Sequence, residues 1–201
     1  MGFSCCWIAV EAGKQKVLDA LGLAETEQTM MPGAGRPKMS CRETPAGWTI
    51  VFNESFNWAT PERVSALSHL GLAVACRFED KAEMQSCAWA ARDGVELWRV
   101  FHDSAKSIFR LDVTGDPPPQ FVAIREGAVS RQVAEGGEEA SVDFIHEVPL
   151  ELAHSICGFR PDECENDEGH VFTVLRESRG PPADSAAAAR PGFWARLFGS
   201  R

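Results

Sequence analysis

The Asp93-Gly94 dipeptide lies between two runs of alternating apolar residues, and it restricts the fold of this chain more than any other feature. The runs cover residues 85–92 and 95–102. A two-residue type I′ turn needs a positive φ angle at both central positions, which Asp and Gly tolerate. The dipeptide therefore predicts a β-hairpin. Counting outward from the turn, we expect Trp89 to face Trp98 at a non-hydrogen-bonded pair, where aromatic side chains stabilise a sheet best.

Other segments also have the composition of strands or of helices. Runs of β-branched, aromatic or alternating apolar residues predict strands at 3–10, 48–52, 72–79, 109–113, 121–124, 142–148 and 171–175. The alternation in 72–79 predicts a strand that is buried on one face only. Polar and Gly-rich stretches predict loops at 24–40 and 126–141.

Start and stop signals predict three short helices. Gly22 is placed to end a helix that begins near residue 14, and Gly158 is placed to end one over 149–157. Thr60 and Pro61 form a capping residue and a first helical position, so a further helix starts there. Short connections between strands require antiparallel pairing. We therefore predict an α+β fold, an antiparallel β-meander sheet with two or three helices packed on one face.

Length and composition set the domain organisation. The chain has 201 residues, of which 44% are hydrophobic, and it carries seven cysteines. This predicts a single α+β domain at 1–178, followed at 179–201 by a flexible Pro/Ala linker and a short aromatic-basic tail. Residues 1–10 lack the basic start of a secretory signal, so we expect a cytoplasmic protein with reduced cysteines.

The charge distribution points to a basic protein partner. The net charge of −9 argues against nucleic-acid binding, which requires a basic surface. Residues 134–178 hold twelve carboxylates against Arg160 and Arg176. Such a field speeds encounter with a basic partner, although a solvated face that only aids solubility is the alternative. The predicted contact residues are Glu138, Glu139, Asp162, Glu163, Glu165, Asp167 and Glu168.

A metal site is an alternative use of the same region. His154 and Cys157 are three residues apart on a predicted helix, and Cys164 and His170 follow. Zinc accepts this set of ligand types, but the spacing differs from that of common zinc fingers. The competing interpretation is a buried Cys157 and solvent-exposed histidines. We therefore expect no cofactor, with a zinc-binding protein or enzyme as the alternative.

The sequence contains few candidates for catalysis. It has neither a G-x-S-x-G turn nor a Gly-rich phosphate loop. His102-Asp103-Ser104 supplies the residue types of a hydrolase triad, but consecutive residues at a strand end diverge. Cys87 is expected close to His102, yet it lies in an apolar run where a thiol stays protonated. We predict a structural role for His102 and a protein that is not an enzyme.

The tail offers a second interaction surface. Residues 192–198 combine aromatic and basic side chains in one amphipathic turn, which suits a membrane surface or a protein groove. Alternatively, the tail folds back onto the acidic face of the same chain or stays loose.

Two stretches resemble small bacterial proteins of unassigned function. The first contains Trp89, Asp93-Gly94 and the run Leu97-Trp98-Arg99-Val100, and the second runs from Pro149 to Glu163. Some proteins of this kind are immunity proteins that neutralise a toxin domain. The resemblance spans much of 3–175 and implies a bacterial, cytoplasmic immunity protein that acts by protein–protein contact. It assigns no site residues.

Overall fold

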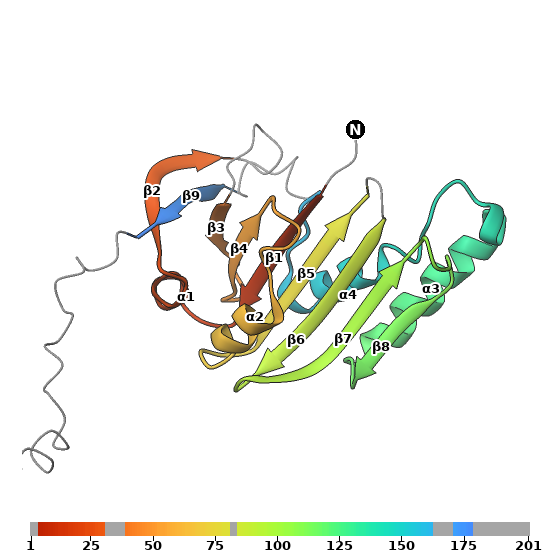
Figure 1. Ribbon diagram of the computed structural model, residues 1–201, viewed down its shortest axis with the longest axis horizontal. Helices are drawn as coiled ribbons and strands as arrows, with labels where there is room; N and C mark the ends of the chain where they lie inside the picture. Colours follow the sequence, from red (N-terminus) through yellow and green to blue (C-terminus); the bar gives the residue numbers. More distant parts are fainter. Residues whose placement is uncertain (1–3, 31–38, 81–83, 163–170, 179–201) are drawn as a thin grey trace, which may run out of the picture.

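The described strands form a single antiparallel sheet of nine strands (Figure 1). The computed structural model describes residues 4–30, 39–80, 84–162 and 171–178. The sheet order is β2-β9-β3-β4-β1-β5-β6-β7-β8. The strands are β1 (Ser4–Val10), β2 (Leu23–Met30), β3 (Met39–Glu43), β4 (Thr49–Asn53), β5 (Ala73–Glu79), β6 (Gln85–Arg92), β7 (Val95–Asp103), β8 (Leu111–Gly115) and β9 (Phe172–Glu177).

Helices cover both faces of this sheet. The helices are α1 (Lys14–Leu21), α2 (Pro61–Leu67), α3 (Gln120–Ala134) and α4 (Val148–Cys157), with a 3₁₀ turn at Gly137–Glu139. The α+β class is confirmed. Strands β5 to β8 form a meander, but the sheet as a whole is larger than predicted. The expectation that all helices pack on one face is wrong, because α1 and α2 contribute to one core and α4 to the other.

The two cores explain why the central strands are buried on both faces. Trp7, Val74 and Cys157 belong to the core under α4, which we call the α4-side core. Ile8, Ala75 and Leu67 belong to the opposite core. The prediction that 72–79 is buried on one face only is therefore wrong for Ala73–Cys76, which are buried on both faces. An alternating pattern does not distinguish a strand buried on one face from a strand buried on both when the residues of the second face are alanines.

The predicted hairpin is present, but its register differs. Asp93 and Gly94 have φ angles of 52° and 81°, as the type I′ turn requires. A β-bulge leaves Leu97 without a partner, so Trp98 pairs with Ala90 and Trp89 pairs with Arg99. The extra residue shifts the register by one, so the side chains of β7 beyond the bulge lie on the opposite face of the sheet from the one predicted. The two tryptophans therefore lie in opposite cores, and the predicted Trp–Trp pair is wrong.

Gly115 permits this bulge. A Cβ atom on Gly115 would lie 2.1 Å from the carbonyl oxygen of Leu97, and its φ angle is +71°. Both facts favour glycine at the end of β8. The backbone N–H of Asp116 then donates to the Leu97 carbonyl at 3.1 Å, which ties the edge strand to the bulge.

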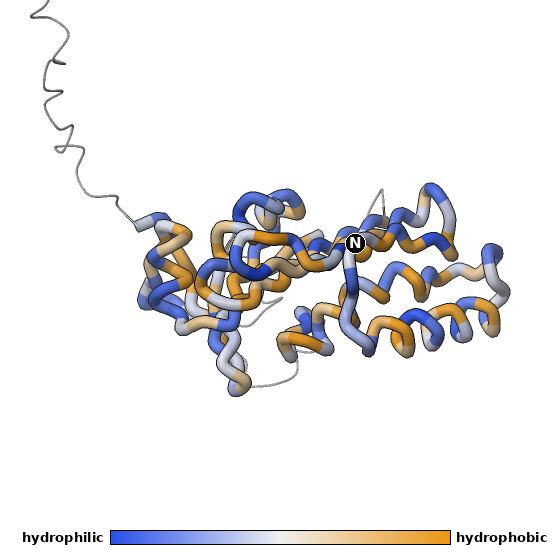
Figure 2. Tube along the Cα trace, turned by 90° about the horizontal axis from the view of Figure 1, so that it is seen from below, coloured by the Kyte–Doolittle hydropathy of each residue, from blue (hydrophilic) through white to orange (hydrophobic). Residues whose placement is uncertain are grey.

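Helix α3 was not expected from the sequence. The sequence predicts a strand at 121–124 and, from its Gly- and Glu-rich composition, a loop at 126–141, and both predictions are wrong. Gly127 and three valines have low helix propensity. Tertiary packing stabilises the helix instead, since Phe121, Ile124 and Ala128 pack with Leu111. Turned by 90°, α3 forms a separate layer beside the strands at the right of the molecule (Figure 2).

The predicted strand at 142–148 is also wrong, because side chains satisfy the backbone of this segment. The amide of Gln132 donates to the carbonyls of Gly137 and Val142 and accepts from the N–H of Phe144. The segment is therefore held as a turn against α3. The polar run at 24–40, predicted as a loop, includes the edge strand β2.

The predicted helix ends at Gly22 and Gly158 and the predicted start at Thr60 are confirmed. Gly22 and Gly158 adopt left-handed conformations after α1 and α4. The Thr60 hydroxyl accepts from the N–H of Arg63 at the start of α2. In the described ranges, no helix combines the length and apolar character needed to cross a membrane.

Candidate functional site

A compact cluster of titratable side chains lies at the end of β7. His102 comes from β7, Ser104 follows that strand, and Asp143 and His146 lie in the turn before α4. His102 Nε2 is 2.8 Å from Asp143 Oδ2, and His102 Nδ1 is 2.8 Å from the carbonyl oxygen of Arg110. Ser104 Oγ donates to Asp143 Oδ2 at 2.6 Å.

These contacts favour the protonated form of His102. Both partners of its ring nitrogens are oxygens that accept hydrogen bonds, which suits a ring that carries a proton on each nitrogen. Burial lowers the pKa of His102, but the hydrogen bonds to Asp143 and Arg110 outweigh burial, and the net pKa is raised. The two side chains of the His102–Asp143 pair are 0% and 6% exposed.

Asp143 is the centre of the network. Burial alone would raise the pKa of its carboxyl group, but donation from His102 and Ser104 lowers the pKa to about 2. Its second oxygen accepts from the N–H groups of Ile145 and His146 at 2.9 and 3.0 Å. Asp143 therefore holds the turn before α4 against the end of β7.

His146 completes the cluster as a neutral ring. Both of its ring nitrogens are buried without a hydrogen-bond partner among the described residues. Its ring contacts Phe78 edge-on with centroids 4.5 Å apart, and its centroid lies 6.0 Å from that of His102. Burial lowers the pKa of His146 to about 4, so the ring is uncharged at neutral pH.

The cluster has the residue types of a hydrolase triad but a different arrangement. In a triad, the base uses one ring nitrogen for the nucleophile and the other for the acid. Here Asp143 and Ser104 both lie at Nε2, where Ser104 Oγ is 3.2 Å away, while a backbone carbonyl occupies Nδ1. A ring nitrogen that donates to Asp143 has no lone pair for proton abstraction. The geometry supports a structural tie.

The Cys87–His102 couple considered from the sequence is not formed. Cys87 pairs with Phe101 rather than Val100, and it belongs to the core opposite His102. Burial raises the pKa of the Cys87 thiol to about 11. The side chain is therefore a protonated core residue.

Two of the four candidate zinc ligands, His154 and Cys157, are described by the structure, and they lie in different surroundings. Cys157 is 1% exposed in the α4-side core, and burial raises its pKa to about 11. His154 lies near the surface, 4.0 Å from a carboxylate oxygen of Glu151. Cys164 and His170 lie outside the described residues. Among the residues that are described, no group of three or more potential ligands gathers around a common point.

The predicted acidic contacts are placed in different surroundings. Glu138 and Glu139 are exposed in the 3₁₀ turn after α3. Asp162 is also exposed, but its carboxylate accepts from Arg160 Nε at 2.8 Å. Glu163, Glu165, Asp167 and Glu168 lie outside the described residues, as does the tail at 192–198.

Several carboxylates of the acidic segment serve the fold. Arg160 contacts Glu147 Oε2 at 2.5 Å and Glu151 Oε1 at 2.5 Å, in addition to Asp162. Asp143 pairs with His102. Arg160 offsets one of the three negative charges around it, and all four acids are engaged in ion pairs within the chain.

No protein family model, no curated protein and no solved structure matches the chain. Function must therefore be argued from the chain itself.

Sequence reasoning missed the roles of Asp143 and His146. In the sequence Asp143 belongs to the acidic segment, and its separation of 41 positions from His102 gives no sign of contact. The only local signal is the residue Asp143 itself, because an aspartate often accepts from the N–H two residues onward, as it does from Ile145.

Proposed function

We propose that this chain is a non-enzymatic binding protein of the bacterial cytoplasm that acts by protein–protein contact on a basic partner, most specifically a toxin domain that it neutralises. The acidic turn after α3 supports this proposal. Glu135, Glu138 and Glu139 are exposed there, and no ion pair engages them within the described residues. Glu138 and Glu139 belong to the proposed contact set, whose other members are Asp162, Glu163, Glu165, Asp167 and Glu168.

The chemistry of the buried cluster agrees with a binding role. The charged pair of His102 and Asp143 uses its protons and lone pairs to hold the turn before α4. That turn follows the acidic turn after only three residues, so the same network fixes the base of the proposed surface. A rigid base lowers the entropy lost on binding.

The proposal is tested by reversing charges on the proposed surface and, as a control, on a distant part of the chain. Proteins that the immobilised chain retains from a lysate of the native host are identified. The rate at which the purified partner associates with the chain is then measured at 50 and 500 mM salt. We expect Glu138→Lys with Glu139→Lys to slow association at least tenfold at low salt, and higher salt to slow the unmodified chain.

A matched control changes the same charge elsewhere. Glu27 and Glu177 are exposed on β2 and β9, and seven strand spacings of about 4.8 Å separate β9 from β8, or roughly 34 Å. Glu27→Lys with Glu177→Lys should leave the rate within twofold. Equal effects of both pairs would reject the proposed surface. Failure of the chain to restore growth of cells producing the partner would reject neutralisation.

A further inference from the structure

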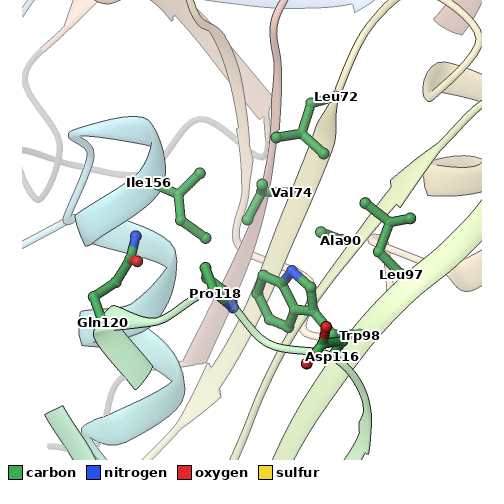
Figure 3. Close-up of a pocket in the computed structure, with 9 residues that line it drawn as sticks. All are labelled: Leu72, Val74, Ala90, Leu97, Trp98, Asp116, Pro118, Gln120 and Ile156. Atoms are coloured by element: carbon green, nitrogen blue, oxygen red, sulfur yellow. The ribbon is translucent and has the colours of Figure 1, made fainter. Parts of the chain in front are cut away.

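An apolar groove opens on the face that bears α4 (Figure 3). It has a volume of about 460 Å³. The floor is formed by Val74, Ala90 and Trp98 from three adjacent strands, and Ile156 of α4 points into the same space. Leu72 and Leu97 form the opposite wall, and Pro118 lies in front. The groove is a region where the described helices leave the α4-side core partly open.

The walls of the groove are unusually exposed for a core. The β-bulge places Leu97 at 41% exposure, and Leu72 and Ile156 are half-buried. Burial of apolar surface is favourable, so these walls suit contact with apolar side chains. The walls therefore form an apolar surface that no described segment covers.

The rim of the groove is acidic. Asp116 is exposed beside Trp98, and its carboxylate makes no hydrogen bond or ion pair within the described residues. An occupant that carries aromatic side chains next to a positive charge would match both the walls and the rim.

Residues 193–198 of the same chain have this chemistry. Phe193, Trp194, Leu197 and Phe198 are apolar, and Arg196 lies between them. The segment 179–201 carries four arginines against one aspartate, whereas the whole chain has a net charge of −9. The preceding part is therefore strongly negative and attracts the segment.

The intervening chain is long enough to reach the groove. The described part ends at Ser178 after β9, and the groove lies over β5, β6 and β7, which are four to six strand spacings away, or about 19–29 Å. The fourteen residues 179–192 span at most about 46 Å when extended. Their average end-to-end distance as a coil is about 20 Å, close to the span, where effective concentration is highest.

We propose that the groove formed by Leu72, Leu97, Trp98 and Ile156 is the binding site of residues 193–198 of this chain, with the side chain of Arg196 directed to Asp116. This contact is independent of the partner surface proposed above.

The test uses the full chain and a thiol reporter in the groove. Leu97→Cys places a thiol on the exposed wall, while the six described native cysteines are buried. Alkylation by iodoacetamide at position 97 is followed by peptide mass spectrometry. We expect Trp194→Glu with Phe198→Glu to accelerate alkylation at least fivefold, and Asp116→Arg to accelerate it two- to threefold.

A second reporter supplies the control. Val122 is 57% exposed on the outer face of α3, so the thiol of Val122→Cys should react at the same rate with and without the two tail substitutions. Rates at position 97 should not depend on protein concentration. Unchanged alkylation at position 97 would overturn the inference. Slower alkylation at higher concentration would also overturn it, because the occupant would then come from a second copy.

Discussion

Replacing Asp143 with asparagine tests whether the buried ion pair holds the turn before α4. The substitution keeps the shape of the side chain and an oxygen for the N–H groups of Ile145 and His146, but it removes the charge opposite His102. A buried imidazolium without its counterion is strongly destabilising. The substitution therefore keeps the acceptor for the turn, while the carboxylate oxygen that accepts from His102 and Ser104 is replaced by an amide donor.

The magnitude follows from the pKa of Asp143. Its lowering from 3.8 to about 2 is equivalent to about 2.4 kcal/mol of native-state stability, and breaking a buried pair typically costs about 3–5 kcal/mol. We expect Asp143→Asn to reduce the free energy of unfolding by about 2–4 kcal/mol at pH 6, measured by urea denaturation with tryptophan fluorescence.

The pH dependence gives a second readout. Because the pKa of Asp143 is lowered on folding, its contribution is present above pH 3.8 and is lost as the pH falls toward 2. Because the pKa of His102 is raised, its contribution is present below pH 6.5 and is lost as the pH rises through the folded-state pKa. The difference between the two proteins should therefore be largest between about pH 4 and 6.5.

A surface pair provides the control for this experiment. Asp112 contacts Arg110 at 2.8 Å, but the two side chains are 44% and 60% exposed. Asp112→Asn should therefore cost less than about 0.5 kcal/mol. A loss as small as this for Asp143→Asn at pH 6, with an unchanged denaturant slope, would refute the assignment of a charged pair.

Three further outcomes follow from single sites. Burial lowers the pKa of His146 from 6.5 to about 4, so the unmodified protein should lose about 3 kcal/mol of stability as the pH falls across this range, and His146→Phe should remove that loss in urea titrations. Gly115→Ala should lower the free energy of unfolding by at least about 2 kcal/mol, because its Cβ would meet the Leu97 carbonyl, whereas Gly127→Ala on open helix surface should raise it by about 0.5–1 kcal/mol. Burial raises the pKa of all six described thiols, so they should react with a disulfide reagent at least about a hundredfold more slowly in buffer than in urea; comparable rates would contradict the packing.

The number of carboxylates in the acidic segment differs from the number that face water in the folded chain. The sequence gives twelve carboxylates in 134–178, but Glu147, Glu151 and Asp162 surround Arg160, and Asp143 is buried. Only the folded chain separates acids that neutralise a neighbour from acids that face water. Glu138 and Glu139 belong to the second group, which is why they carry the proposed contact.

Local signals in the sequence determined the parts of the fold that depend on a few neighbouring residues. Asp93 and Gly94 fixed a turn through their positive φ angles, and Gly22, Gly158 and Thr60 fixed helix ends through backbone conformation and capping. These effects act within four or five residues along the chain. They can therefore be read without knowledge of the rest of the molecule.

Tertiary structure decided the features that depend on distant partners. Leu97 bulges out beside Gly115, and this one extra residue sends Trp89 and Trp98 into opposite cores. Helix α3 forms despite poor helix propensity because its inner face packs. The pKa of His102 is raised because Asp143 reaches it from a turn far along the chain. The free energy of each depends on contacts between segments that only folding brings together, so no local pattern encodes it.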